Sequence, residues 1–376
     1  MTDSLRIVVC GMVCGVPRRG GAAWAVLQYV LGLRRLGHEP VLLEPVEEAA
    51  VLEEAEVTGP FDLLARRYGL VGRAALVSGS ADAAHGMTPD GIRAALQGAD
   101  LLLNLSGMLR DDHLLALARR RVYVDLDPGF TQAWDAQGID VGLEGHDRYV
   151  TVGPQIGVAG CPVPTGGREW IGTVPPVVLD HWPPGRPLVH DAYTSIGDWR
   201  GYGVVEHDGM VYGQRAHSAR ALADLPRISG EAMILALAID PGEEADLALL
   251  AAGGWDLLDP EVVAATPWDY ASFVSGSRAE IGVAKAGYVT AACGWFSDRS
   301  ACYLASGRPV VAQDTGFAVW LPTGTGLLAY ADLDGAVAAM EAVRADPKAH
   351  ARAARAIAEE HLDSDRVLAR LLEAVA

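Results

Sequence analysis

Residues 277–317 read SRAEIGVAKAGYVTAACGWFSDRSACYLASGRPVVAQDTGF, and their pattern predicts a strand at Glu280–Ala284, a loop, a helix and a second buried strand at Val310–Ala312. The helix is expected to begin at Ser297 or Asp298, since the side-chain oxygen of either residue accepts from free N–H groups of a first helical turn. In a doubly wound sheet, ligands bind outside the carboxyl ends of the strands. A helix that begins at that edge offers N–H donors and the positive end of its dipole to a phosphate.

The same alternation of strands and helices extends along the chain in two successive blocks. We therefore predict an α/β fold of two Rossmann-like, doubly wound domains that face each other across a cleft. A segment rich in proline, Asp180–Pro187, is expected to link them. The predicted domains are residues 1–183, which bind the acceptor, and residues 184–350, which bind a nucleotide sugar. Residues 351–376 are predicted to form helices that pack back toward the first domain.

The composition of the chain argues against several classes of binding partner. The formal net charge is −18, from 48 acidic and 30 basic residues, and this balance argues against nucleic acid or an anionic membrane as a partner. We expect no membrane span, because no apolar stretch is long enough. Five cysteines without framework spacing favour a reducing, cytoplasmic setting. The glycines after the first strand do not follow G-x-G-x-x-G, which disfavours a nicotinamide cofactor. The oligomeric state is left open, a homodimer being one option.

Two segments carry a resemblance to a known family. The run VPRRGGAAWAVLQYVLGLRRLGHEPVLLE at residues 16–44 resembles the N-terminal loop, helix and strand of the GT-B glycosyltransferases, specifically of the bacterial family-1 type. Residues 295–317 resemble their donor-site helix, which is followed by A-x-G-x-P-V-V. The chain has neither an H-x-G-G-x-G-T run at Gly294–Ser300 nor a clear E-x7-E pattern, so retention and inversion both stay open.

The resemblance implies a hexosyltransferase-type enzyme that moves a sugar from a nucleotide-diphosphate sugar to a small-molecule acceptor, such as a bacterial secondary metabolite. No cofactor is implied beyond the nucleotide sugar as co-substrate, and no metal site is predicted. Two alternatives are a nucleotide-sugar epimerase or hydrolase of the same fold and a binding module without activity.

Candidate donor-binding residues lie at predicted strand ends and helix starts, and each also has an ordinary structural interpretation as a cap, a turn, an ion pair or a packing residue. Glycines permit close approach of a backbone to a ligand, arginine and lysine neutralise phosphate charge, and aromatic rings stack on a base. Lys285 has an ion pair, for example with Glu280, as its structural alternative. The candidates are Gly20, Gly21, Trp199, Arg200, Trp268, Tyr270, Lys285, Ser297, Asp298, Arg299, Ser300, Gln313, Asp314 and Thr315.

Inverting transfer needs a base that takes the proton of the acceptor hydroxyl. The candidates are His113, His146 and Asp127, with Asp125 as a further option. Asp125-Leu126-Asp127 is the D-x-D sequence that follows a predicted strand, but it lies in the first domain, away from the expected diphosphate site. We therefore expect turnover without a divalent metal.

Overall fold

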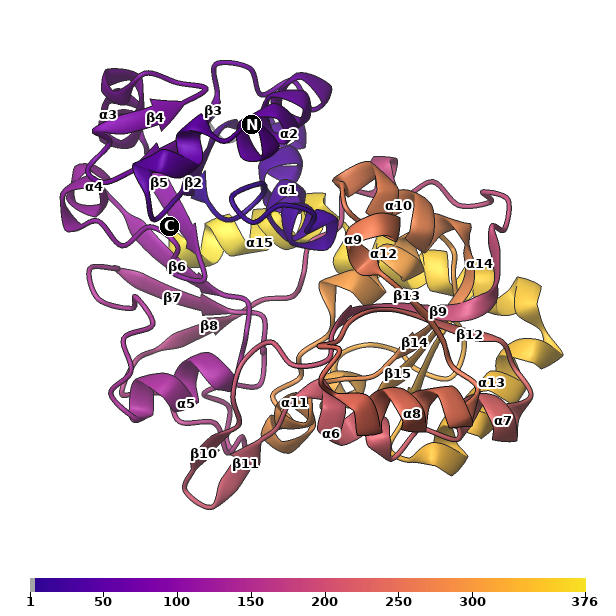
Figure 1. Cartoon of the computed structure of the whole chain (residues 1–376). Coiled ribbons are helices and arrows are strands. Elements are labelled where there is room, and N and C mark those ends of the chain that lie inside the picture. The colour runs from indigo at the N-terminus through magenta and orange to yellow at the C-terminus, as the bar shows by residue number, and fades with distance from the viewer. Residues whose placement is uncertain (1–3) are drawn as a thin grey trace.

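The computed structural model describes residues 4–376 and forms two α/β lobes that lie side by side (Figure 1). The first lobe is built on an eight-stranded sheet in the order β4-β3-β2-β1-β5-β6-β7-β8. All neighbouring strands in it are parallel except β4, which runs antiparallel to β3 at the edge. The strands are β1 (Arg6–Cys10), β2 (Glu39–Pro45), β3 (Ala74–Ser78), β4 (Ala83–His85), β5 (Leu101–Leu105), β6 (Arg121–Asp125), β7 (Arg148–Thr151) and β8 (Trp170–Gly172).

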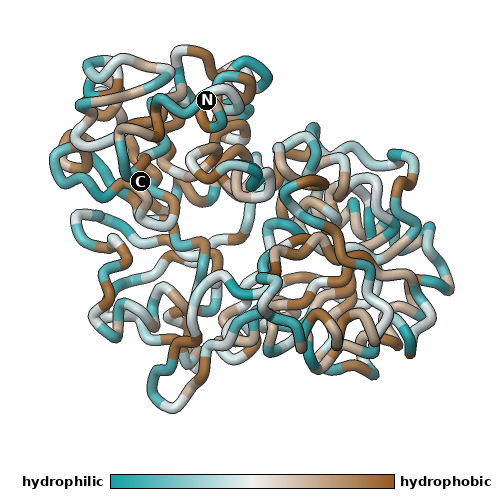
Figure 2. The backbone as a smooth tube through the Cα atoms, viewed as in Figure 1, coloured by the Kyte–Doolittle hydropathy of each residue, from teal (hydrophilic) through white to brown (hydrophobic). Residues whose placement is uncertain are grey.

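The second lobe contains a six-stranded parallel sheet in the order β13-β12-β9-β14-β15-β16. Strand β12 is a continuous apolar run, whereas the central strands β9 and β14 also bury polar residues such as Thr194, Ser277 and Glu280. Figure 2 shows hydrophobic residues inside both lobes. The strands are β9 (His190–Asp198), β12 (Met233–Ala238), β13 (Asp256–Leu258), β14 (Ser277–Gly282), β15 (Val310–Gln313) and β16 (Leu327–Tyr330).

Helices connect successive strands in both lobes. Those of the first lobe are α1 (Gly20–Arg35), α2 (Ala55–Arg67), α3 (Pro89–Gly98), α4 (Asp112–Leu117) and α5 (Phe130–Ala136). Those of the second are α6 (Arg215–Arg220), α7 (Leu225–Ser229), α8 (Glu244–Gly253), α9 (Pro260–Val263), α10 (Pro267–Gly276), α11 (Ala286–Ala291), α12 (Asp298–Ala305), α13 (Leu333–Ala345) and α14 (Pro347–Ile357).

The chain crosses between the lobes twice. Residues 173–189 connect β8 to β9, and after α14 a π-helical turn (Ala358–Leu362) leads into α15 (Ser364–Val375), which lies against α1 in the first lobe (Figure 1). Gly32 permits the close contact, because a Cβ there would lie 2.5 Å from a methyl carbon of Leu368. Arg35 pairs with Asp365 at 3.0 Å on the surface of the same contact.

Apolar packing also joins the lobes on the other side of the cleft. A two-stranded hairpin, β10 (Val205–His207) and β11 (Met210–Tyr212), leaves the second lobe and packs beside α5. Phe130 of α5 contacts Tyr212 and Tyr288 edge to face, with ring centroids 5.8 and 5.6 Å apart. The hairpin was not predicted, and neither was α11, because the sequence around both carries no clear period.

Candidate active site

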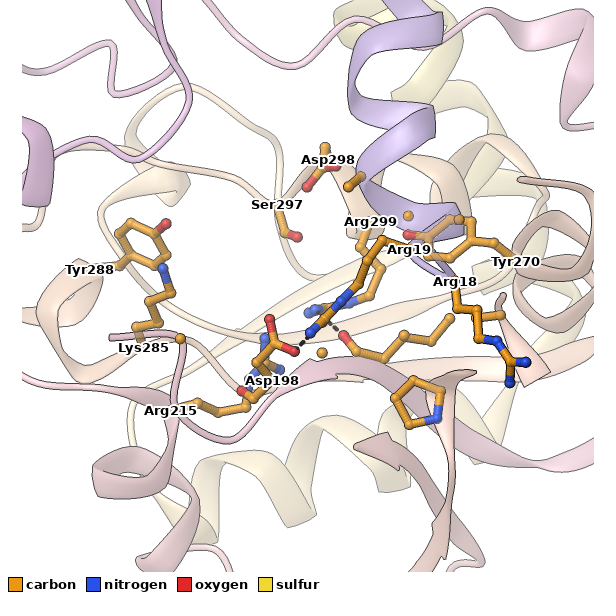
Figure 3. A pocket seen from close by; sticks show the side chains of 18 of the residues that line it. Arg18, Arg19, Asp198, Arg215, Tyr270, Lys285, Tyr288, Ser297, Asp298 and Arg299 are labelled. Carbon is orange, nitrogen blue, oxygen red and sulfur yellow. Dashed lines mark hydrogen bonds and ion pairs between the residues drawn. The ribbon is translucent and has the colours of Figure 1, made fainter. Parts of the chain in front are cut away.

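A pocket of about 480 Å³ opens between the lobes, at the carboxyl ends of β9 and β14 and at the N-termini of α1 and α12 (Figure 3). Several cationic side chains point into it, although the chain as a whole is acidic. Its lining residues are Arg18, Arg19, Gly20, Gly21, Ala22, Ile196, Gly197, Asp198, Gly201, Tyr202, Arg215, Pro260, Ala264, Tyr270, Lys285, Tyr288, Trp295, Ser297, Asp298 and Arg299.

The loop before α1 forms the first-lobe wall of the pocket. Gly20 must be a glycine, because a Cβ there would lie 2.2 Å from the backbone oxygen of Thr266 in the opposite lobe. Gly21 faces the ring of Tyr270, which a Cβ would approach to 2.9 Å. The two glycines therefore let α1 meet the second lobe closely, and Arg19 reaches across the opening to Asp198 at 2.5 Å.

The N-terminus of α12 forms the opposite wall. Ser297 occupies the cap position, but its side chain makes no capping hydrogen bond, so the expected cap is not formed. The N–H groups of the first turn are therefore left for other acceptors, and the Asp298 carboxylate is one of them. Arg299 points back into the protein: its Nε donates to the fully buried Glu280 at 2.5 Å and one Nη donates to the carbonyl of Ile196 at 2.8 Å. Arg299 lines the pocket but is held chiefly by Glu280.

Arg215, at the start of α6, is a pocket cation that sequence analysis missed. Its Nε donates to the carbonyl of Asp198 at 3.1 Å, and its guanidinium lies over Gly197, where a Cβ would be 2.5 Å from one Nη. Within residues 4–376, no carboxylate forms an ion pair with it. Burial, with the charge of Arg299 nearby, lowers the pKa of Arg215 to about 10, so it stays charged at neutral pH.

Lys285 lies at the other end of the pocket in a polar cluster that spans both lobes. Its Nζ donates to the Tyr202 hydroxyl at 2.5 Å and lies 3.3 Å from Asp127. Tyr202 and Tyr288 both donate their hydroxyl hydrogens to Asp127. Burial lowers the pKa of Lys285, while the Asp127 carboxylate opposes that change. The ion-pair partner of Lys285 is thus Asp127, and Glu280 is used by Arg299.

The structure does not bring the two histidine candidates to the pocket. His113 is exposed on α4. His146 is buried and satisfied, since Nδ1 lies 3.1 Å from the carbonyl of Leu143 and Nε2 lies 3.1 Å from the Asn104 amide. Asp127 does reach the interface, but its carboxylate is engaged by Lys285 and two tyrosines and does not line the pocket.

Asp125 has a structural position beneath Asp127. Its buried carboxylate accepts from Thr131 at 2.7 Å, Gln132 at 2.9 Å and Thr151 at 2.7 Å. Burial raises its pKa, and the hydrogen bonds oppose the rise. Among the described residues, no group of three or more His, Cys, Asp and Glu side chains is arranged to hold a metal ion.

Three of the four candidates placed at strand ends and aromatic positions, Trp199, Arg200 and Trp268, also lie away from the pocket. Trp199 is buried in the second lobe and donates to Asp246 at 2.8 Å, and Arg200 pairs with Glu243. Trp268 lies under the guanidinium of Arg67, 5.2 Å from its ring centroid, outside the pocket. Tyr270 alone of this group lines the pocket, where its ring faces Gly21.

The loop after β15 lies behind the pocket. Ser300 and Gln313 line a small adjacent cavity with Thr315, whose hydroxyl donates to the carbonyl of Trp295. Asp314 accepts from the amide of Gly316 at 2.9 Å and so stabilises the turn. These side chains support the loop that carries Trp295, and the structure brings none of the four into contact with the main pocket.

The pocket is thus lined by five cationic side chains, Arg18, Arg19, Arg215, Lys285 and Arg299, beside a helix N-terminus that has no cap from Ser297. Such a set suits a ligand with two adjacent negative charges, because arginine forks and helix N–H groups both prefer phosphate oxygens. The sequence gives little indication that Arg215 is a binding residue, because Arg215 follows a hairpin whose sequence has no clear pattern.

No protein-family model matches the sequence, and a search of curated proteins gives no match. Solved structures do match over the whole chain. An alpha-glucosyltransferase in complex with UDP and a 13-mer DNA containing an HMU base aligns with a TM-score of 0.64 at 11% identity, covering 100% of both chains. HepE from Anabaena, in complex with UDP and glucose, aligns with a TM-score of 0.57 at 11% identity over 98% of this chain and 100% of that one.

A third match is sucrose-phosphate synthase from Thermosynechococcus elongatus, with a TM-score of 0.52 and 12% identity over 99% of this chain and 100% of that one. The chain therefore has the GT-B fold, and the predicted fold class of two facing Rossmann-like domains is confirmed. At these identities the likeness extends to the fold alone.

The exclusion of nucleic acid is wrong. Several of the alpha-glucosyltransferases that share the fold are in complex with DNA, so the fold is compatible with nucleic acid as a partner. The prediction from net charge was wrong because a chain with an overall charge of −18 still has several cationic side chains around one pocket.

No helix within residues 4–376 is long and apolar enough to cross a membrane.

Proposed function

We propose that this protein is a glycosyltransferase that binds a nucleotide-diphosphate sugar in the pocket between its lobes and transfers the sugar to a small-molecule acceptor, such as a secondary metabolite. The observation that carries the proposal is that Arg215 and the N-terminus of α12 line one pocket between the lobes, with Lys285 at its other end. The fold adds support, since alpha-glucosyltransferase and HepE of the same fold are described with UDP. UDP is therefore the first nucleotide to test.

Charge neutralisation would supply much of the rate. As the bond between the sugar and the diphosphate breaks, negative charge grows on the leaving phosphate. Arg215 and the N–H groups at the start of α12 are placed to receive that charge, and Lys285 lies at the other end of the same pocket. Tyr270 offers its ring at the wall next to Gly21 as an apolar surface for the base or ribose.

The test has two stages. Thermal unfolding is first recorded with UDP, TDP, GDP and ADP, and a rise in melting temperature with one of them identifies the base. The matching glucose donor is then incubated with a panel of small alcohols and phenols and with short DNA. Release of nucleoside diphosphate only when an acceptor is present supports transfer. Release in water alone indicates a hydrolase, and binding without turnover of any donor indicates a binding module.

The cytoplasmic setting belongs to the same proposal. All five cysteines are free in the structure, and four are buried. Free thiols of this kind persist where disulfide formation is not favoured.

A further inference from the structure

A second cavity of about 200 Å³ adjoins the main pocket and shares Trp295 and Asp298 with it. One face of α1 forms its first wall, and residues that follow β6 and β7 form the second. Within residues 4–376, Asp298 is the one charged side chain that lines it, whereas the main pocket is lined by arginines and a lysine. The cavity is lined by Ala25, Gln28, Tyr29, Leu126, Val152, Pro175, Pro176, Trp295, Phe296 and Asp298.

This lining suits an apolar molecule. Aromatic rings, prolines and aliphatic side chains make up most of the wall, and an apolar cavity of about 150 Å³ is enough to hold benzene. A diphosphate would be poorly stabilised there, since no cation lines the wall. The second cavity therefore fits the body of a one- or two-ring molecule better than any part of the nucleotide.

One polar group in the wall lacks the hydrogen-bond partner that such groups normally have. The Tyr29 hydroxyl is buried, its side chain only 2% exposed, and no group in the described structure hydrogen-bonds to it. A buried hydroxyl left without a partner costs about 1–3 kcal/mol. Gln28 is already engaged, because its Oε1 accepts from the amide of Val178 at 2.7 Å.

Asp298 is a second polar group in the wall, and its hydrogen bonds come from the Ser297 side chain and from backbone amides at the helix start. Within residues 4–376 its carboxylate forms no ion pair, since the adjacent Arg299 is turned toward Glu280. Figure 3 shows Asp298 on the opposite side of Ser297 from the guanidinium groups of the pocket. Burial raises the pKa of Tyr29, and the charge of Asp298 raises it further, which indicates that the two groups are close.

No other side chain at the junction is available as a base. Two carboxylates line the two cavities, and one of them, Asp198, is already paired with Arg19 at 2.5 Å. No histidine lines either cavity. Asp298 is left as the carboxylate that faces both the cationic pocket and the apolar cavity.

We propose that the second cavity binds the acceptor, that the acceptor is an apolar alcohol or phenol, and that Asp298 is the base that accepts its proton. This inference rests on the proposed glycosyl transfer. The acceptor O–H bond breaks and its proton passes to the Asp298 carboxylate. The acceptor oxygen forms a bond to the anomeric carbon, and the bond between that carbon and the phosphate oxygen breaks. The electron pair leaves with the nucleoside diphosphate into the cationic pocket.

The test uses 4-methylumbelliferone, a fluorescent two-ring phenol, added to the full chain in the presence of saturating UDP. Binding is followed by fluorescence, and the separate signals of phenol and phenolate give the pH at which the bound probe ionises. Ala25→Trp should fill the cavity and weaken probe binding at least tenfold, while UDP affinity changes less than twofold. The matched control is Ala374→Trp, which fills a different cavity of about 310 Å³ beside α15 and should leave probe binding unchanged.

Asp298→Asn tests the base directly. A negative carboxylate next to the probe hydroxyl keeps the probe protonated, so the variant should bind the probe but ionise it at a lower pH than the wild type does. Ala25→Leu, a smaller change, serves if Ala25→Trp fails to fold.

Several results would overturn the proposal: probe binding that is absent in the wild type, binding lost with Ala374→Trp instead of Ala25→Trp, or an ionisation pH unaffected by Asp298→Asn. Short DNA that competes for the cavity in place of the phenol would also overturn it. UDP binding without probe binding defeats only this inference, whereas failure of every nucleoside diphosphate to bind defeats the proposed function as well.

Discussion

Replacing Arg215 by alanine should weaken nucleotide binding without weakening the fold. Arg215 lines the cationic pocket and has no carboxylate partner in the described structure. Its pKa of about 10 leaves it charged at neutral pH, although burial and the neighbouring Arg299 both disfavour that charge. Asp198 and Glu280 favour the charge of Arg215 from a distance, but no carboxylate of the described residues pairs with it directly, so a phosphate could do so.

The size of the effect follows from the contacts that a phosphate would make there. Hydrogen bonds to a charged group contribute about 1.5–3 kcal/mol. With 1.4 kcal/mol for each factor of ten, UDP affinity should fall roughly 12- to 140-fold in Arg215→Ala. Removing a half-buried cation that forms no ion pair should leave the melting temperature of the free protein unchanged or raise it.

Isothermal titration calorimetry with UDP measures the change, and Arg200→Ala is the matched control. Arg200 lies nearby in the sequence, but it pairs with Glu243 and Asp246 on the second lobe and does not line the pocket. Its loss should alter UDP affinity less than twofold. The reasoning is refuted if folded Arg215→Ala binds UDP as the wild type does, or if Arg200→Ala weakens binding equally.

Four further outcomes are expected. Arg299→Ala should lower the free energy of unfolding by about 3–5 kcal/mol in urea titrations, because it leaves Glu280 buried without its partner. Gly32→Val should lower the melting temperature and reduce turnover more than UDP affinity, because the new side chain forces Leu368 and α15 away from α1. Burial raises the pKa of Asp298 above its value in the unfolded chain. Protonated Asp298 therefore makes its full contribution to the stability of the folded protein below a pH of about 4, and this contribution is lost as the pH rises through the raised pKa. Asp298→Asn should therefore unfold at a higher temperature than the wild type at neutral pH, with the difference vanishing in acid. Turnover should persist in excess EDTA, because side-chain cations and a helix N-terminus neutralise the diphosphate; loss of activity that magnesium restores would contradict this.

Local signals were sufficient for the elements that form the pocket walls. The helix predicted to start at Ser297 or Asp298 begins at Asp298, and the strand predicted at Val310–Ala312 is β15 with one more residue. The first helix, which the sequence predicts to begin near Ala22, begins at Gly20. These segments carry strong patterns because a buried parallel strand followed by a turn leaves few other interpretations.

The sequence did not predict which side chains pair with one another, because the partners are distant in the sequence. Arg299 is held by Glu280 on the neighbouring strand, and Lys285 is held by Asp127 of the other lobe. Trp199 follows a strand end as expected, but its ring turns into the core to meet Asp246. A position at a strand end thus places the backbone near the cleft and leaves the direction of the side chain undetermined.

The features that now distinguish the site had no sequence signal of their own. Arg215 stands out only because the fold leaves it without a carboxylate, and Tyr29 only because the fold buries its hydroxyl without a partner. In both cases the distinguishing feature is a missing contact, and neither hydrophobic periodicity nor a sequence motif can predict a missing contact. Asp298 was expected to hold phosphate, and its place between two cavities became visible only when the lobes were assembled.

A crystal structure of the protein with UDP tests the central claim most directly, since the claim is that the pocket between the lobes is a nucleotide-sugar site. The account predicts that the diphosphate lies at the N-terminus of α12, with Arg215 within hydrogen-bonding distance of a phosphate oxygen and the apolar cavity beyond Asp298 left open. UDP bound elsewhere, or with its base in the cationic pocket and its phosphates in solvent, would contradict it.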